Sequence, residues 1–464
     1  MNASNSFGLD AVNIALFPSD DGSGNKALPL VITPRWNSSK NFLVDWCSTN
    51  RAWLDTKLVT YGAILLRGFC LDTPADIEET IRSYHHDLSN TYRGTSPRHV
   101  MEGTDYVFSA AEVPVNYPIA QHIEMSFLDA PPRQLFFGCI KQANSAGGET
   151  SLADFRQVYR DIPSDLKQKL IDKGVRYQRT HKKVGSYYTY DVSDMLGWPE
   201  LFGTSDKKQV EQMCAAEGIN VEWKGDTFVS VSQQDAFQLH PVTKEPVWFN
   251  HIQVFHWTTF PAELWIAFWR THEVRLLMHC FFVAAFCIVK YGLLGHKMGL
   301  HATYGDGTPI SVKEMQEIRR CIHKNMVFNR WAKGDLVFLD NFSTSHGRQP
   351  TYDRNRKIVV AWADPLTKTN EVKSLTMAPV KNKEDSVPVA YSMENPQERT
   401  PESTLTHSES QVLKEGLYGS LLSSSLHKSL DEGFDNPQDF KHLQHHSNKK
   451  PSFAADANFW EEME

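Results

Sequence analysis

The feature that most constrains the fold of this 464-residue chain is a succession of short strand-like runs without regular helical alternation. Short apolar runs bounded by turn residues are typical of buried strands. The clearest are YGAILLRGF (61–69), YVFSAA (106–111), QLFFGCIKQA (134–143), DLVFLDN (335–341) and RKIVVAWAD (356–364). Strands outnumber helices and no βαβ repeat is visible. The pattern therefore predicts a mainly β fold with flanking helices (α+β), an antiparallel sandwich or jelly roll, and disfavours a doubly wound fold.

Composition divides the chain into three parts. Residues 1–27 are rich in Ser, Asn, Asp and Gly and are predicted to be a flexible N-terminus. Residues 28–369 contain the strand-like runs and are predicted to form one domain. Residues 370–464 are rich in polar residues and have few core-forming clusters, so we expect a disordered tail.

Charge and cysteine content exclude several classes of protein. The net charge is −7 and no basic stripe is present, so we expect no nucleic-acid partner. The seven cysteines form no CxxC pair, which indicates free thiols and argues against a disulfide frame or a zinc ribbon. The N-terminal segment has no basic region followed by an apolar one. No secretory signal is therefore predicted, and a cytoplasmic location is expected.

An apolar insert at about residues 270–300 does not fit a compact β domain. Its core, residues 276–294, is long enough to span a bilayer. Three alternatives remain open: a membrane helix, a helix packed on the domain between strands, or an oddity of the gene model. A membrane span is disfavoured because it would place the segments before and after it on opposite sides of the bilayer.

Three potential metal ligands occur in two separate segments. His122 and Glu124 are two positions apart in QHIEMSF (121–127), and side chains two apart in a strand project from one face. His346 follows a strand-like run far along the chain. Two histidines and one carboxylate leave three open positions on an octahedral ion, which suits Fe(II) that must bind O2 and a bidentate cosubstrate. Because His-x-acid is a common spacing, the prediction depends on the surrounding motifs.

Those motifs resemble the TauD/TfdA (taurine dioxygenase-like, clavaminate synthase-like) family of Fe(II)- and 2-oxoglutarate-dependent oxygenases. The similar segments are QHIEMSF (121–127), GGETSLADF (147–155), HPVTKEPVWFN (240–250) and GDLVFLDNFSTSHGRQPTYDRNRKIVVAW (334–362). The resemblance runs from about residue 28 to 365, broken by the apolar insert. It implies a double-stranded β-helix (jelly roll, cupin-like) core with a helical insert. It also places the family's metal triad on His122, Glu124 and His346.

The same resemblance indicates residues for the cosubstrate. It places a hydroxyl contact to 2-oxoglutarate on Thr150 and the carboxylate-binding arginine on Arg356, with Arg354 and Lys357 as second choices. A planar guanidinium binds a carboxylate through two parallel hydrogen bonds, which a lysine cannot reproduce. The cofactors implied are Fe(II), 2-oxoglutarate and O2, with succinate and CO2 as products.

The substrate is the least constrained part of the prediction. We expect a small molecule, an amino acid or a derivative, oxidised at a C–H bond and most simply hydroxylated. Tyr117, Asn250 and Arg348 are candidate substrate contacts, each equally credible as a core residue. Two alternatives to an active enzyme are a catalytically degenerate binding or scaffold protein and a membrane-anchored variant through residues 276–294. The oligomeric state is left open.

Overall fold

The computed structural model describes residues 7–17 and 28–365, with gaps at 91, 93, 95, 97, 129–130, 187–195 and 217–218. The tail predicted at residues 370–464 lies outside the described residues.

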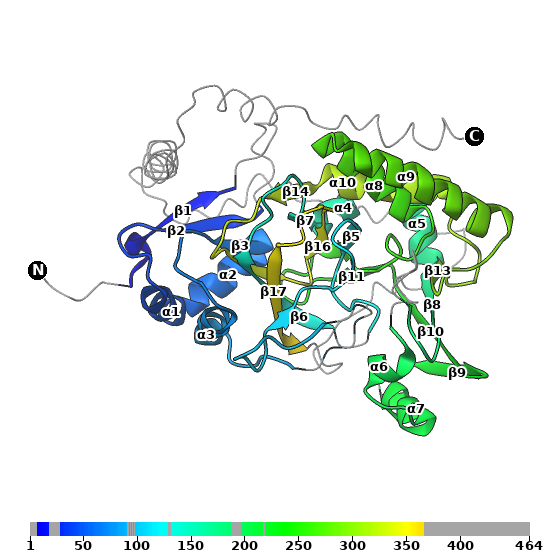
Figure 1. The fold of residues 1–464 in the computed structure, drawn as a ribbon, viewed down its shortest axis with the longest axis horizontal. Coiled ribbons are helices and arrows are strands. Elements are labelled where there is room, and N and C mark those ends of the chain that lie inside the picture. The colour runs from blue at the N-terminus through cyan, green and yellow to red at the C-terminus, as the bar shows by residue number, and fades with distance from the viewer. Residues whose placement is uncertain are drawn as a thin grey trace, which may run out of the picture. The chain divides into compact units, whose positions relative to one another are not determined.

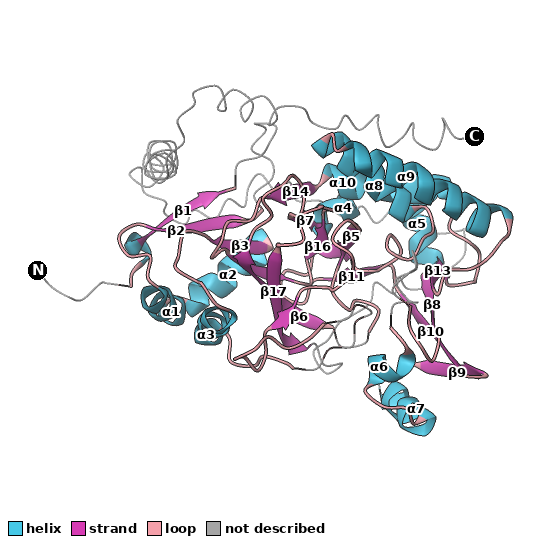
Figure 2. Ribbon diagram, in the orientation of Figure 1, coloured by secondary structure: helices cyan, strands magenta, loops and turns pink. Residues whose placement is uncertain are grey.

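A seven-stranded sheet forms the centre of the described chain (Figures 1 and 2). Its strands, in spatial order, are β1 (Val12–Leu16), β2 (Leu30–Pro34), β3 (Ala63–Leu66), β15 (Leu336–Asp340), β6 (Pro132–Lys141), β17 (Lys357–Pro365) and β4 (Phe108–Ser109). The β2–β3 pair is parallel and the other neighbours are antiparallel. The mainly β fold with helices that the sequence predicts is confirmed.

Residues 7–17, which fall in the segment expected to be a flexible N-terminus, contain a paired strand. The strand β1 pairs with β2 along its whole length, from Val12 opposite Pro34 to Leu16 opposite Leu30. A short 3-10 turn, η1 (Leu9–Ala11), precedes it. The segment is polar on average, but it contains the five-residue run VNIAL (12–16). The backbone N–H and C=O groups of this run form hydrogen bonds with β2.

A second antiparallel sheet carries the candidate site. It consists of β14 (Met326–Asn329), β7 (Thr150–Asp154), β16 (Thr344–Arg348) and β5 (Ile119–His122), in that order. Leu152 of this sheet belongs to the same apolar cluster as Leu135, Val360 and Trp362 of the large sheet. Alternate side chains of a strand project from opposite faces. The residues of the large sheet that alternate with these therefore pack on its other face.

Those other residues pack against three N-terminal helices, α1 (Lys40–Thr49), α2 (Arg51–Tyr61) and α3 (Pro74–Tyr84). Phe136, Val359 and Ala361 of the sheet share a cluster with helix residues that include Trp46 and Ile77. The large sheet is therefore buried on both faces, which explains why its central strands read as continuous apolar runs.

The middle of the chain forms a third, four-stranded antiparallel sheet and several helices (Figure 2). The sheet contains β13 (Leu300–Tyr304), β8 (Val175–His181), β10 (Thr227–Gln234) and β9 (Asn220–Lys224). The remaining elements are α4 (Phe155–Asp161), α5 (Ser164–Lys173), α6 (Trp198–Phe202), α7 (Lys207–Ala216), the hairpin β11 (Phe237–Leu239) with β12 (Pro246–Trp248), and α10 (Val312–Lys324).

The apolar insert forms a helix packed on a neighbouring helix. The helix α9 (Val274–Cys287) continues into the π-helical η3 (Ile288–Leu293) and packs along α8 (Thr259–Thr271) (Figure 1). Its inner residues, such as Cys280 and Val283, are buried against α8. Its outer residues Phe282 and Leu293 are 62% and 77% exposed.

By length and composition alone, the segment Val274–Leu293 could cross a membrane, and 33% of it is buried within the protein. Strand pairing argues against such a span. The strand β13 follows the helix and pairs with β8, which precedes it, and β16 pairs with β5 and β7 in the same way. A bilayer between the two halves of the chain would break these pairs.

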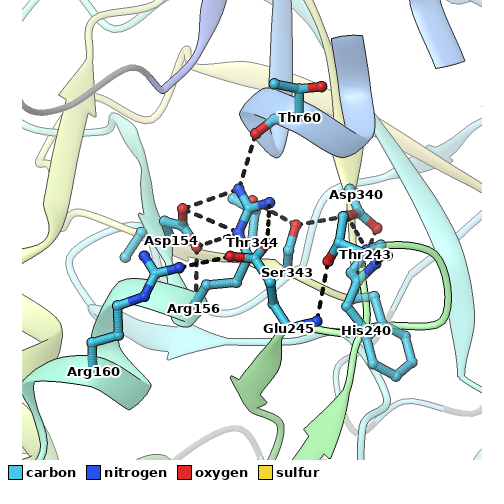
Figure 3. A network of polar contacts seen from close by, with 12 residues as sticks. Thr60, Asp154, Arg156, Arg160, His240, Thr243, Glu245, Asp340, Ser343 and Thr344 are labelled. Carbon is cyan, nitrogen blue, oxygen red and sulfur yellow. Dashed lines mark hydrogen bonds and ion pairs between the residues drawn. The ribbon is translucent and has the colours of Figure 1, made fainter. Parts of the chain in front are cut away.

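A polar network fixes the turn that leads into β16 (Figure 3). Asp340 accepts hydrogen bonds from His240 Nε2 at 2.8 Å and from Ser343 Oγ at 2.6 Å. The Nδ1 atom of His240 accepts from the backbone N–H groups of Val242 and Thr243, which leaves Nε2 as the donor. The HPVT segment therefore positions the turn that precedes His346.

Arg156 extends the same network to the helices (Figure 3). Its guanidinium donates to Asp154 at the end of β7 and to the backbone carbonyls of Val59 and Thr60 in α2. The arginine is buried, so these bonds satisfy a charge that would otherwise be costly. The small sheet is thus tied to the N-terminal helices near the candidate site.

Candidate metal centre

Two neighbouring strands bring three ligand atoms together. His122 at the end of β5 lies directly opposite His346 in β16. Glu124 follows in the turn after β5, one point where the structure differs from the predicted continuous strand. The Glu124 Oε2 atom lies 3.8 Å from His122 Nε2 and 3.5 Å from His346 Nε2. One ligand atom from each residue lies within 4.8 Å of the others.

Hydrogen bonds outside the triad hold two of these side chains. His122 Nδ1 is 2.9 Å from the Ala120 carbonyl, which can only accept, so Nδ1 carries the proton and Nε2 keeps its lone pair. The Asn341 side chain accepts from the Glu124 N–H at 2.8 Å and donates to the Glu124 carbonyl at 3.0 Å. It also donates to the Pro132 carbonyl, so one buried amide fixes the turn that presents Glu124.

The electrostatics keep Glu124 and His346 in metal-binding forms. Burial by itself raises the pKa of Glu124, but Arg98 and the two histidines outweigh this effect and hold the pKa well below its usual value. Burial, with His122 alongside, lowers the pKa of His346 to about 4. A carboxylate and a neutral imidazole are the protonation states that bind a metal ion.

This donor set fits a divalent iron ion. Two imidazole nitrogens and one carboxylate oxygen converge from one side, and the opposite side is the cavity. The arrangement matches the facial triad that leaves coordination positions open on Fe(II).

The residues predicted to bind the cosubstrate lie together on the same cavity. Arg356 and Thr150 both line it, and Arg356 Nη2 is 3.4 Å from Thr150 Oγ1. Arg356 Nε donates to the Gly148 carbonyl at 2.6 Å, and Trp331 Nε1 donates to Thr150 Oγ1 at 3.2 Å. Burial lowers the pKa of Arg356 to about 10, which still leaves it charged near neutral pH.

The backbone conformation and the surroundings of Gly148 explain why the GGET motif has glycine at this position. It has φ +78°, and a Cβ atom there would lie 3.2 Å from Arg356 Cδ. A side chain would therefore strain the backbone and press on the arginine. Among the described residues, the second choices Arg354 and Lys357 do not line the cavity.

The three predicted substrate residues have different surroundings. Tyr117 lines the cavity and contacts the ring of Phe260. Asn250 does not line it; its amide donates to the Ala236 carbonyl and accepts from the Ile252 N–H, so it is a structural residue.

Arg348 lines the cavity, and both terminal nitrogens of its guanidinium are hydrogen-bonded, whereas its buried Nε atom has no partner. It donates to the backbone carbonyls of Ala111, Val113, Pro114 and Tyr117. These bonds hold the 111–117 segment beside Arg348, and binding of an anionic substrate by Arg348 stays a prediction.

Sequence reasoning missed three cavity residues. Arg98 donates to Glu124 Oε2 at 3.1 Å, His251 packs beside the His122 ring, and Glu263 pairs with His323 at 2.9 Å. His251 directly follows the HPVTKEPVWFN segment, so a segment quoted one residue longer would have included it. Arg98 and Glu263 lie in segments with no recognisable spacing, and no sequence signal marks them.

Comparison with known proteins agrees with this geometry. The family described as "Taurine catabolism dioxygenase TauD, TfdA family" matches residues 31–362. The dapdiamide synthesis protein DdaC of Enterobacter agglomerans is 29% identical over 316 residues, 68% of this chain and 85% of that protein. A clavaminate synthase-like protein of Arabidopsis thaliana is 25% identical over 348 residues, 73% of this chain and 94% of that protein.

Among solved structures, PvcB of Pseudomonas aeruginosa, an Fe, alpha-ketoglutarate dependent oxygenase, is 13% identical with a TM-score of 0.43. The match covers 78% of this chain and 94% of PvcB. The family match extends over most of the chain and includes every segment of the candidate metal centre. The chain belongs to the TauD, TfdA family and is an Fe(II)- and 2-oxoglutarate-dependent dioxygenase.

Proposed function

We propose that His122, Glu124 and His346 hold the Fe(II) ion and that Arg356 and Thr150 bind the distal carboxylate of 2-oxoglutarate. The observation that carries this assignment is the convergence of the three ligand atoms on the cavity that Arg356 also lines. The arginine and the triad are thus available to the two ends of one small dicarboxylate. The guanidinium binds a carboxylate through charge-assisted hydrogen bonds.

The core is assigned to the double-stranded β-helix class. The large sheet and the smaller antiparallel sheet share one apolar cluster, and the two histidines of the triad come from the smaller sheet. Within that sheet, β16 lies between β7 and β5. Thr150 and His346 are therefore carried by directly paired strands, which gives the site a rigid base.

The reaction is assigned as oxidation of a C–H bond, most simply hydroxylation, of a small molecule such as an amino acid derivative. When bound, Fe(II) supplies the site at which O2 and 2-oxoglutarate react, with succinate and CO2 as products. The protein orients His122 through the Ala120 carbonyl and Glu124 through Asn341. Apolar side chains such as Val254 and Phe260 line the cavity and exclude water from the reaction.

The test is an anaerobic titration of purified protein with Fe(II) and 2-oxoglutarate. Bidentate binding should produce a weak visible charge-transfer band. Arg356→Gln should weaken 2-oxoglutarate binding roughly ten- to hundredfold, because hydrogen bonds to a charged group are lost. The matched control is Arg320→Gln, which removes an exposed arginine paired with Glu317.

Two results would contradict the assignment. A folded protein that gives no band would overturn the metal and cosubstrate sites together. A band that forms equally well in Arg356→Gln would leave the triad intact and remove the role of the arginine. In air, succinate formation that depends on 2-oxoglutarate distinguishes an active enzyme from a degenerate binding protein.

A further inference from the structure

Arg98 is a buried cation beside the metal triad whose role the proposed function does not assign. Its side chain is 6% exposed and lines the cavity. The guanidinium packs over the Tyr92 ring, 4.6 Å from the ring centroid. Its Nε atom is buried without a hydrogen-bond partner. An unpaired donor on a buried charge is costly, so it points to an acceptor that binds there.

The ion pair of Arg98 involves a candidate metal ligand. Arg98 Nη2 donates to Glu124 Oε2, the same oxygen that lies nearest to both histidine Nε2 atoms. A metal ion at the triad shares the negative charge of this carboxylate. With a metal bound, the buried Arg98 charge would keep its contact with Tyr92 but share Glu124 with the metal, and a buried charge that is incompletely paired is unfavourable.

The charges around the cavity indicate the sign of the missing partner. Three arginines line it, Arg98, Arg348 and Arg356, together with two carboxylates, Glu124 and Glu263. These residues contribute one net positive charge. Fe(II) adds two positive charges and 2-oxoglutarate two negative ones, so the loaded site keeps one positive charge. A monoanionic ligand completes the balance.

We propose that Arg98 is a substrate-binding residue that donates hydrogen bonds to the carboxylate of a monoanionic substrate beside the iron. The substrate class is a carboxylic acid with an apolar body. That body would lie along the cavity wall formed by Tyr117, Val254 and Phe260. This inference rests on the proposed function because it requires the metal to engage Glu124. It narrows the substrate from small molecules in general to carboxylates.

The experiment uses the full-length protein loaded anaerobically with Fe(II) and 2-oxoglutarate. Hexanoate, hexan-1-ol and hexylammonium are titrated as probes of equal chain length, and the shift of the charge-transfer band gives a dissociation constant. Hexanoate should bind about tenfold or more tightly than the other two. Arg98→Gln should remove that preference, and Arg98→Lys should keep part of it because the charge remains.

Controls separate the inference from the proposed function. The 2-oxoglutarate dissociation constant is measured for each variant, and probe affinities are compared at equal saturation with 2-oxoglutarate. Arg320→Gln should behave as the unmodified protein. If Arg98→Gln no longer binds iron, the preference for hexanoate is compared between Arg98→Lys and the unmodified protein. A band that forms normally but shows no preference for hexanoate would overturn the inference alone.

Two other outcomes would also overturn it. One is equal hexanoate affinity in the unmodified protein and in both Arg98 variants. The other is competition between hexanoate and 2-oxoglutarate, which would place the probe at Arg356 or on the metal. Absence of any band would remove the proposed function, and the inference with it.

Discussion

The two walls of the cavity are built on different principles. On the strand wall, β5, β7 and β16 supply His122, Thr150 and His346 from paired backbones. On the helix wall, α8 and the α9–η3 helix supply side chains such as Phe260, Cys287 and Tyr291. Strand pairing fixes the first set through the backbone, whereas the second is fixed by apolar contacts between helices.

Because of this difference, the metal ligands and the side chains that line the substrate cavity should tolerate substitution to different degrees. A metal ion tolerates little displacement of its ligands, and paired strands with buried polar contacts hold them rigidly. A substrate cavity tolerates replacement of apolar side chains as long as volume is preserved. We therefore expect substitutions on the strand wall to affect iron binding and stability, and substitutions on the outer helix surface to have small effects.

The largest effect should come from removal of a ligand. Glu124→Ala or His346→Ala should reduce Fe(II) affinity by more than about a hundredfold, since even outer contacts of a metal site are worth roughly ten- to hundredfold. Anaerobic titration measures the affinity, and circular dichroism checks folding. His296→Ala, at an exposed position, is the control. Unchanged affinity in a ligand variant would remove that residue from the site.

Asn341→Ala should give the next largest effect. It removes three hydrogen bonds around the Glu124 turn from a fully buried position. The free energy of unfolding should fall by about 2–4 kcal/mol and Fe(II) affinity by roughly ten- to hundredfold. Urea denaturation and iron titration measure the two quantities. Asn220→Ala, on an exposed strand, should change neither. A loss of stability without weaker iron binding would separate the turn from the metal site.

His256, where the two walls meet, should make stability depend on pH. Burial lowers its pKa to about 3, and its ring nitrogens contact Thr258 Oγ1 and the Ile310 carbonyl. Between pH 6.5 and 3 the unfolded chain binds a proton at this histidine and the folded chain does not. Stability contributed by His256 therefore falls with acidification by up to about 1.4 kcal/mol per pH unit.

His256→Gln should reduce this slope, measured by urea denaturation of metal-free protein between pH 7 and 5. His296→Gln, at an exposed site, should leave the slope unchanged. An identical slope in the His256 variant would show that other groups control the acid sensitivity.

The smallest effect should come from the outer face of α9. Phe282 is 62% exposed, so Phe282→Asp should change the free energy of unfolding by no more than about 0.5 kcal/mol. Val283, the next residue, is fully buried, and Val283→Asp should cost about 3 kcal/mol or more because a charge enters an apolar contact. Similar costs for both variants would mean that the outer face is covered in the native protein.

Backbone periodicity located strands: the apolar runs at 61–69 and 335–341 correspond to β3 and β15. The triad was predicted from the family-like motifs around His122, Glu124 and His346, because the HxE spacing alone is common. Arg98 and Glu263 could not be found in this way, because they reach the cavity through tertiary packing. Asn250 and Arg348 were chosen for their motifs, although their polar atoms satisfy backbone groups.

The order of the ligands along the chain has a consequence for biosynthesis. His346 is made 222 residues after Glu124, and its strand lies between two strands made earlier. A growing chain therefore has at most two of the three ligands until residue 346 has been added, and two ligands bind a labile divalent ion weakly. We therefore expect tight iron binding only after β16 has been made and has paired with β5 and β7.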